Sequence, residues 1–187
     1  TVKNSGTIKL NGKACENCTG SKSVGIYIVL NGATLQNQGV LSARSLNLSS
    51  LGGTVVAGVG STFTANDISG HLQLSAEHVS DGFASHYTAT DVIQANDTSG
   101  LKVSSGSAMF NARLADNGSD ITMTRRAFNE LTENGSLAAF LEHNYALGNN
   151  EAFYRELKSI GTAGAFRSAM NDLGGMGSLP RFAHEDM

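Results

Sequence analysis

The sequence predicts a mostly β fold, a right-handed parallel β-helix that is closed by a C-terminal cap of short α-helices. Up to about residue 126, apolar and polar residues alternate in short runs, which is typical of β-strands. Residues 31–50 and 60–80 resemble each other at an offset of about 28 residues, as successive coils of a solenoid do. From residue 127 onward, apolar residues recur at helical spacing instead.

The first predicted domain, residues 1–126, consists of short strands separated by turns. Gly, Asn, Asp or Ser bounds each apolar run, and these residues favour turns. An antiparallel sandwich also uses many short strands and is the competing fold, but hairpin dipeptides are scarce, which favours the β-helix. In order, the runs are TIKL, GIYIVL, the phrase ATLQNQGVLSARSLNLSS, GTVVAG, STFTANDIS, HLQLS, GLKVSS, AMFNARL and DITMTRR.

The second predicted domain, residues 127–187, contains three amphipathic helices and a linker. We expect the first helix to begin at Ser136 and to stop at Gly148, and the second to run from Asn150 to Gly161. The third opens at Thr162 and closes at the glycine pair 174–175. Helices this short need tertiary packing, so we expect them to pack on one another or on the end of the β-helix. The apolar residues expected to form this packing are Phe140, Phe153, Leu157, Phe166 and Met170.

Charge and hydropathy exclude two classes of partner. The 13 basic residues face 16 acidic ones, for a net charge of -3, whereas nucleic-acid-binding proteins concentrate Lys and Arg. The longest apolar run, near residues 25–30, is far shorter than the roughly 20 residues of a membrane helix. The chain begins inside a strand-like phrase and shows no signal peptide, so we expect it to be a segment of a longer protein.

The order of these phrases resembles a known family. The strand phrase SDITMTRRAF (119–128) is followed by LTENGSLAAFLEH and by AMNDLGG (169–175). This order is similar to the C-terminal end of the passenger of an autotransporter, a type V secreted protein of Gram-negative bacteria. The likeness extends to the subtilisin-like serine protease branch of that family.

The resemblance implies a non-catalytic role for this segment. In the family, the last coils of the passenger act as an autochaperone, which folds first and templates the coils that precede it. The implied partners are upstream passenger coils and a downstream outer-membrane β-barrel of the same chain, and the implied location is the cell surface or the medium, reached through the periplasm. The catalytic triad of a protease parent would lie upstream of Thr1, and the resemblance implies no cofactor.

Cys15 and Cys18 are the two cysteines of the chain. Because autotransporter passengers cross the oxidising periplasm, the resemblance implies a local disulfide between them. Reduced thiols and a metal or redox site are the alternatives. A zinc site would lack a second cysteine pair, and a thioredoxin-like centre would need a βαβ context.

Three other groups of residues have side chains that could form a site. His78, Asp81 and His86 lie near Ser80 and Ser85, but no GxSxG motif surrounds a serine, so we expect no triad. Residues 116–120, DNGSD, lack the EF-hand spacing of acids and are expected to form a turn with Gly118 at positive φ. One of the arginines Arg125 and Arg126 would bind carbonyl groups at the end of the last coil.

Two alternative functions are compatible with the sequence. The first is surface adhesion or carbohydrate binding on a flat polar face, with a host surface or glycan as the partner and Tyr27 and Tyr87 as contacts. The second is a polysaccharide lyase or hydrolase, which would require three carboxylates to converge in a groove. The acidic residues are spread along the sequence, which makes the second less favoured.

Overall fold

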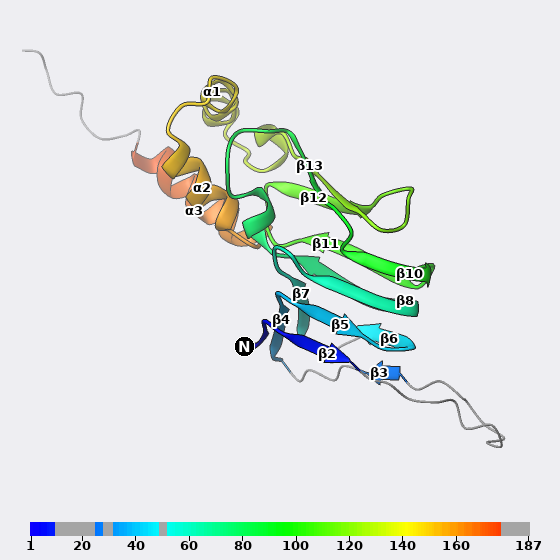
Figure 1. Ribbon diagram of the computed structural model, residues 1–187. Helices are drawn as coiled ribbons and strands as arrows, with labels where there is room; N and C mark the ends of the chain where they lie inside the picture. The colour runs from blue at the N-terminus through cyan, green and yellow to red at the C-terminus, as the bar shows by residue number, and fades with distance from the viewer. Residues whose placement is uncertain (10–24, 28–31, 49–51, 177–187) are drawn as a thin grey trace, which may run out of the picture.

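The computed structural model describes residues 1–9, 25–27, 32–48 and 52–176. This part of the chain is mostly β, with a nearly closed parallel sheet, a small antiparallel sheet and three short α-helices (Figure 1). The helices lie at the end of the molecule opposite to the N-terminal strands.

The parallel sheet is built from short strands and one long one. Its ten described strands are β1 (Val2–Asn4), β2 (Thr7–Lys9), β3 (Gly25–Tyr27), β4 (Thr34–Asn37), β5 (Val40–Ser42), β6 (Ser45–Leu48), β7 (Thr54–Ala57), β8 (Thr62–Leu74), β10 (Ile93–Asp97) and β11 (Leu101–Ser105). The strands form three columns, in each of which successive strands pair in parallel. The columns are β1–β4–β7–β8–β11, β2–β5–β8–β10 and β3–β6–β8. All three columns include β8, because it contributes a different part of its length to each.

In-register side chains stack along the columns. In one column Leu41 lies beside Phe63, and Phe63 lies beside Ile93; all three are at most 2% exposed. Burial of such apolar ladders is the main stabilising contribution to the sheet. The in-register pair Ser45 and Asp67 is separated by 22 residues, and the pair Asn4 and Asn37 by 33. The offset between in-register residues therefore varies from coil to coil, on either side of the offset of about 28 residues expected from the sequence.

Polar residues are also stacked at the corners of the sheet. Asn37 is buried and accepts a hydrogen bond from Asn4 Nδ2 at 2.8 Å, and its own Nδ2 donates to the carbonyl of Gly39. A Cβ atom at Gly39 would lie 2.0 Å from the carbonyl oxygen of Gly6. The corner therefore requires glycine, because the two coils approach too closely for any side chain.

The last strands before the helices depart from the parallel pattern. The strands β9 (His86–Ala89), β12 (Phe110–Leu114) and β13 (Ile121–Arg125) form a three-stranded antiparallel sheet in the order β12–β13–β9. The expectation that residues 1–126 consist of parallel coils throughout is therefore wrong for these strands. A tight turn between β12 and β13 reverses the chain, and Gly118 in it has φ +72°, as expected from the DNGSD phrase.

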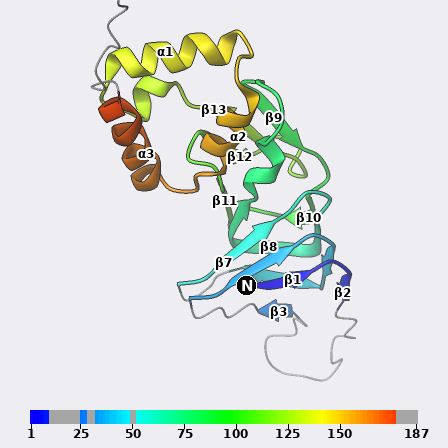
Figure 2. The same cartoon turned by 90° about the vertical axis from the view of Figure 1, so that its left-hand side faces the viewer.

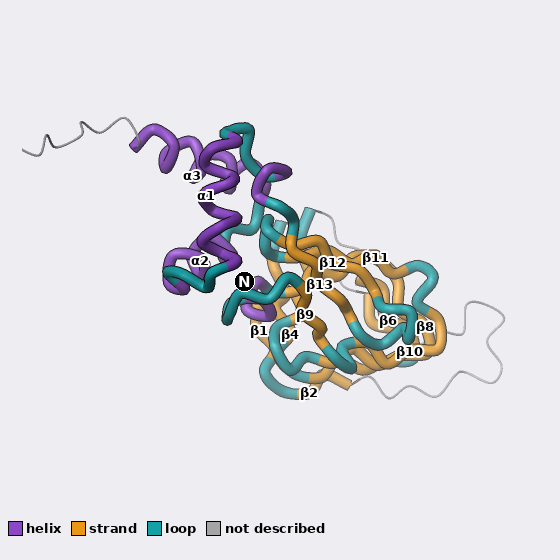
Figure 3. The backbone as a smooth tube through the Cα atoms, turned by 90° about the horizontal axis from the view of Figure 1, so that it is seen from above, coloured by secondary structure: helices purple, strands orange, loops and turns teal. Residues whose placement is uncertain are grey.

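The helical region follows β13. It comprises the 3₁₀ turn η2 (Phe128–Glu130) and the helices α1 (Gly135–Ala146), α2 (Glu151–Ser159) and α3 (Ala163–Met176). Another 3₁₀ turn, η1 (Ala76–Val79), lies earlier in the chain, between β8 and β9. Asn134 caps α1 by accepting a hydrogen bond from the N–H of Leu137, so the expected cap at Ser136 is wrong by two residues. Asn150 caps α2, as expected. Figures 2 and 3 show that α1 and α3 lie together beyond the antiparallel sheet.

One hydrophobic core runs from the parallel sheet into the helices. Of the residues expected to pack in the cap, Leu157, Phe166 and Met170 are buried, and Phe153 packs against the core while partly exposed. Phe140 is 63% exposed, so its expected place in the core is wrong. The buried face of α1 consists of Ala138, Leu141 and Tyr145, and Phe140 lies on a different side of the helix.

Candidate functional site: the junction between the sheet and the helical cap

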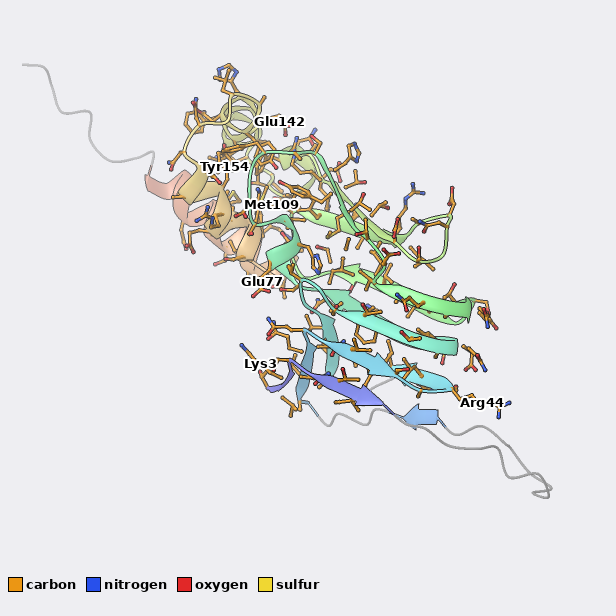
Figure 4. The ribbon with its side chains drawn as sticks, viewed as in Figure 1. Lys3, Arg44, Glu77, Met109, Glu142 and Tyr154 are labelled. Carbon is orange, nitrogen blue, oxygen red and sulfur yellow. The ribbon has the colours of Figure 1, made fainter. Side chains whose placement is uncertain are left out.

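A cluster of polar and aromatic side chains lies where the sheet meets the helices. We call it the cap junction and define it by Phe83, Arg125, Phe128, Glu142, Tyr145, Tyr154 and Lys158. These residues come from the loop after η1, the end of β13, η2, α1 and α2. In Figure 4, Glu142 and Tyr154 lie in this region and Lys3 lies at the other end of the molecule.

Arg125 joins the last strand to α1. Its guanidinium forms a two-pronged ion pair with the carboxylate of Glu142 and donates to the carbonyl of Arg126 at 2.9 Å. Glu142 also accepts a hydrogen bond from the backbone N–H of Phe128 at 3.2 Å. Paired donors in this geometry fix orientation as well as adding energy, so α1 is held in one position relative to β13.

The ionisation of Glu142 reflects this pairing. Partial burial acts to raise the pKa of Glu142, but the hydrogen bonds from Arg125 and Phe128 and the positive charge of Arg125 outweigh it. The pKa of the carboxyl therefore lies below its ordinary value, and Glu142 is ionised at neutral pH.

Four aromatic rings pack around this ion pair. The centroid of Tyr145 lies 5.1 Å from that of Phe83, 5.2 Å from that of Tyr154 and 6.1 Å from that of Phe128, in edge-to-face arrangements. The Arg125 guanidinium lies 4.7 Å from the centre of the Tyr145 ring, within the range of a cation–π interaction. The cluster combines the loop after η1, η2 and two helices into one packed unit.

The buried tyrosine hydroxyls donate to backbone carbonyls. Tyr145 Oη donates to the carbonyl of Ala84 at 2.9 Å, and Tyr154 Oη donates to that of Leu141 at 2.7 Å. Burial is the largest cause that raises the pKa of Tyr154 to about 12, and burial also raises the pKa of Tyr145. Both hydroxyls therefore remain protonated and act as donors.

Lys158 fastens α2 to the loop after η1. It is 1% exposed, and its ammonium group donates to the carbonyls of Gly82 and Ser80 and lies 3.5 Å from Tyr87 Oη. Its Nζ atom also lies 5.7 Å from the centres of three aromatic rings, those of Phe83, Tyr87 and Tyr145. Burial lowers the pKa of Lys158, against the nearby carboxylates of Glu151 and Asp81, which raise it.

The arrangement is suited to holding the contributing elements together. Arg125 is paired with Glu142 through its two terminal nitrogens, Lys158 binds backbone carbonyls, and the two tyrosine hydroxyls act as donors. In the described part of the chain, only Arg125 Nε of this cluster is buried without a partner. Buried polar networks of this kind fix one relative position of the elements that contribute to them. The cap junction therefore locks the helices onto the end of the sheet.

Of the residues that could suggest a triad in the sequence, Ser80 Oγ donates to Asp81 Oδ1 at 3.2 Å, whereas the two histidines have other partners. His78 Nε2 lies 3.3 Å from the carbonyl oxygen of Ala57, and His86 Nδ1 lies 3.3 Å from Thr124 Oγ1. The carboxylate of Asp81 faces Arg155 at 3.7 Å. Cys15 and Cys18 lie outside the described residues.

The DNGSD turn is organised by its own side chains. Asn117 Nδ2 donates to Asp120 Oδ2 at 2.7 Å, and Asp120 Oδ1 accepts the backbone N–H of Asp91 at 2.8 Å. The hydrogen bond from Asp91 is the largest cause that lowers the pKa of Asp120. Among the described residues, no group of three or more His, Cys, Asp or Glu side chains could hold a metal ion.

Arg125 donates to the carbonyl of Arg126, which follows the antiparallel strand β13 rather than ending a parallel coil. Its pairing with Glu142 was not expected. Lys158 was also missed. Its position gives a signal in retrospect, because it is adjacent to Leu157 and four residues after Tyr154, on the buried face of α2.

Tyr87, which the sequence suggested as a glycan contact, is half-buried and donates its hydroxyl to the carbonyl of Asp81 at 2.6 Å.

The fold and the junction define a solenoid-like β protein with a helical end cap. Comparisons with protein-family models, with curated proteins and with solved structures find no match to this chain. In the described part of the chain, no helix combines the length and the apolar character needed to cross a membrane.

Proposed function

We propose that the chain is a non-catalytic C-terminal segment of an autotransporter passenger, in which a right-handed parallel β-helix ends in a helical cap. The segment assists folding and secretion and presents an upstream effector, such as a serine protease, at the surface of a Gram-negative bacterium. Its partners are the upstream coils and the downstream outer-membrane β-barrel of the same protein. This proposal rests on the sequence resemblance and on the geometry of the two ends of the sheet.

The observation that carries the proposal is the difference between those two ends. At one end, the buried Lys158 and the Arg125–Glu142 pair fasten helices onto the last strands. At the other, β1, β2 and β3 each pair on one side within the described residues, and Val2 and Ile8 are 59% and 44% exposed. A terminal segment of a solenoid requires one closed end and one end to which further coils can be added.

The physical argument concerns the order of folding. A solenoid folds by adding coils to a neighbour that is already folded, so a stable terminal unit provides the nucleus. Exposed strand edges also invite association with other chains. A cap that covers one edge leaves the other as the surface on which upstream coils of the same protein assemble.

Urea unfolding of the purified 187-residue chain, followed by far-UV circular dichroism, tests this function. We expect a cooperative transition, because a folding nucleus must be stable without the upstream coils. A chain that is already unfolded in buffer without urea would contradict the proposal. The same urea titration in the presence of reductant tests the proposed disulfide. Reductant should lower the urea midpoint of the parent chain. It should leave unchanged the midpoint of the control, a double variant with Cys15→Ser and Cys18→Ser.

A further inference from the structure

A small polar pocket lies away from the cap junction, on the side of the parallel sheet. It has a volume of about 270 Å³ and lies between the corner that joins β7 to β8, the 3₁₀ turn η1 and the link from β9 to β10. Its polar lining comprises Ser61, Thr62, His78, Thr88, Thr90 and Asp91. Segments that are distant in the sequence thus contribute hydroxyls, an imidazole and a carboxylate to one cavity.

Asp91 is the charged group of this pocket. Its backbone has φ +54°, a conformation that non-glycine residues seldom adopt, and its N–H is held by Asp120 Oδ1 at 2.8 Å. No hydrogen bond or ion pair to another described residue engages its carboxylate. The loop therefore fixes the backbone at Asp91 and leaves the carboxylate available as an acceptor.

The rest of the lining is neutral. Burial is the largest cause that lowers the pKa of His78 below its ordinary value of 6.5, so its imidazole is uncharged at neutral pH. The described residues that line the pocket include no Lys or Arg, which disfavours an anionic ligand. Ser61 is 4% exposed and its hydroxyl has no partner in the described part of the chain, which is rare for a buried hydroxyl.

The lining also has an apolar part, formed by Val59, Ala89 and Val92. Val59 is 57% exposed at the surface, whereas Val92 is buried. A ligand that presents hydroxyl groups on some edges and C–H groups on a face matches this mixture. Such a ligand donates to a carboxylate and exchanges hydrogen bonds with Thr hydroxyls.

We propose that this pocket binds one neutral sugar residue, with the Asp91 carboxylate and the Thr hydroxyls as its hydrogen-bonding groups. The pocket volume of about 270 Å³ is close to that of the smallest ligand pockets, about 300 Å³. It is far larger than the volume that one water molecule occupies in the liquid, about 30 Å³. The pocket differs from the flat tyrosine-bearing face considered from the sequence. The site does not depend on the cap junction or on the autotransporter role.

Titration of the ¹⁵N-labelled 187-residue chain with sugars, followed by amide chemical shifts, tests the site. The probes are glucose, galactose, mannose and N-acetylglucosamine at millimolar concentrations, each as the free sugar and as its methyl glycoside. We expect at least one to produce saturable shifts concentrated at residues 59–62 and 88–92. Binding of a methyl glycoside identifies the terminal residue of a glycan as the source, and binding of the free sugar alone identifies a soluble sugar.

Two variants test the assigned groups. Asp91→Asn keeps a residue type that tolerates positive φ and removes the charge, which should weaken binding about fivefold, because hydrogen bonds to charged groups are stronger than neutral ones. Thr88→Val removes a hydroxyl at nearly constant volume from an exposed strand position and should also weaken binding. Asp116→Asn, an exposed residue outside the pocket, is the control for the change in net charge and should bind as the parent chain does.

Three results would overturn the proposal. They are the absence of saturable shifts with all the probes, shifts spread evenly over the surface, and unchanged affinity in Asp91→Asn. Urea unfolding of the same chain reports on the folding role separately, so failure of the sugar site and failure of the proposed function are distinguishable.

Discussion

At the helical end of the molecule, a buried lysine, an arginine–glutamate pair and four aromatic rings hold the last strands beneath the helices. At the opposite end, Val2 in β1 and Ile8 in β2 are exposed, and β1, β2 and β3 each pair on one side within the described residues (Figure 1). Between them, the columns of the parallel sheet are held by stacked apolar ladders. The middle is therefore stabilised by stacks of repeated apolar side chains, whereas the closed end is stabilised by polar contacts that each occur once.

The largest expected effect contrasts the middle of the sheet with its open edge. Leu46 is fully buried and lies in register with Ile68, so Leu46→Ala should lower the free energy of unfolding by about 2–5 kcal/mol. Ile8 is 44% exposed in the edge strand β2, and Ile8→Ala should cost less than about 1 kcal/mol. Urea midpoints of the two variants measure the contrast. Equal losses would show that the edge is as tightly packed as the middle of the sheet.

The next largest expected loss of stability concerns the contacts that hold α2 against the loop after η1. Lys158→Met keeps an unbranched side chain but leaves the carbonyls of Ser80 and Gly82 without the ammonium donor. Because each buried polar group left unpaired costs about 1–3 kcal/mol, we expect a loss of about 2–3 kcal/mol in urea unfolding. Lys102→Met, at an exposed position in β11, is the matched control and should change stability by less than about 0.5 kcal/mol. If both variants have the same midpoint, Lys158 does not fasten the cap.

The same contrast explains what could be predicted from the sequence. The stacked strands repeat alternating apolar residues, so Leu41, Leu46 and Phe63 lie in phrases that the sequence identifies as strands. The helices and the cap at Asn150 follow from local signals as well. These features depend on neighbours in the sequence or on a repeat.

The features that were not predicted depend on contacts between distant residues. Lys158 and Gly82 are separated by 76 residues, and a lysine on a helix is ordinarily expected to face water. The antiparallel pairing of β12 and β13 was missed because the Asn117-Gly118 dipeptide, a hairpin signal, was interpreted as a simple turn within a run of parallel coils. Phe140 was misplaced because apolar character alone does not determine which side of a helix is buried.

The smallest effect tests the link between β13 and α1 through its pH dependence. The folded-state pKa of Glu142 lies below its ordinary value of 4.5, chiefly through Arg125 and Phe128 acting against burial. The stabilisation is therefore fully present above about that pH and is lost as the pH falls through the folded-state value. Because the Glu142 side chain is 43% exposed, solvent screening limits the effect, and Glu142→Gln should cost at most about 1 kcal/mol at neutral pH.

Urea midpoints at a series of pH values from neutral to about 3 measure this difference. The gap between the parent chain and Glu142→Gln should narrow on acidification, because protonation of the parent removes the same negative charge that the substitution removes. Glu133→Gln, an exposed site with no ion pair to another described residue, is the control and should track the parent chain throughout. A gap that stays constant into acid would mean that Glu142 acts through the shape of its side chain, so that the Arg125 contact holds α1 by packing and hydrogen bonding rather than by charge.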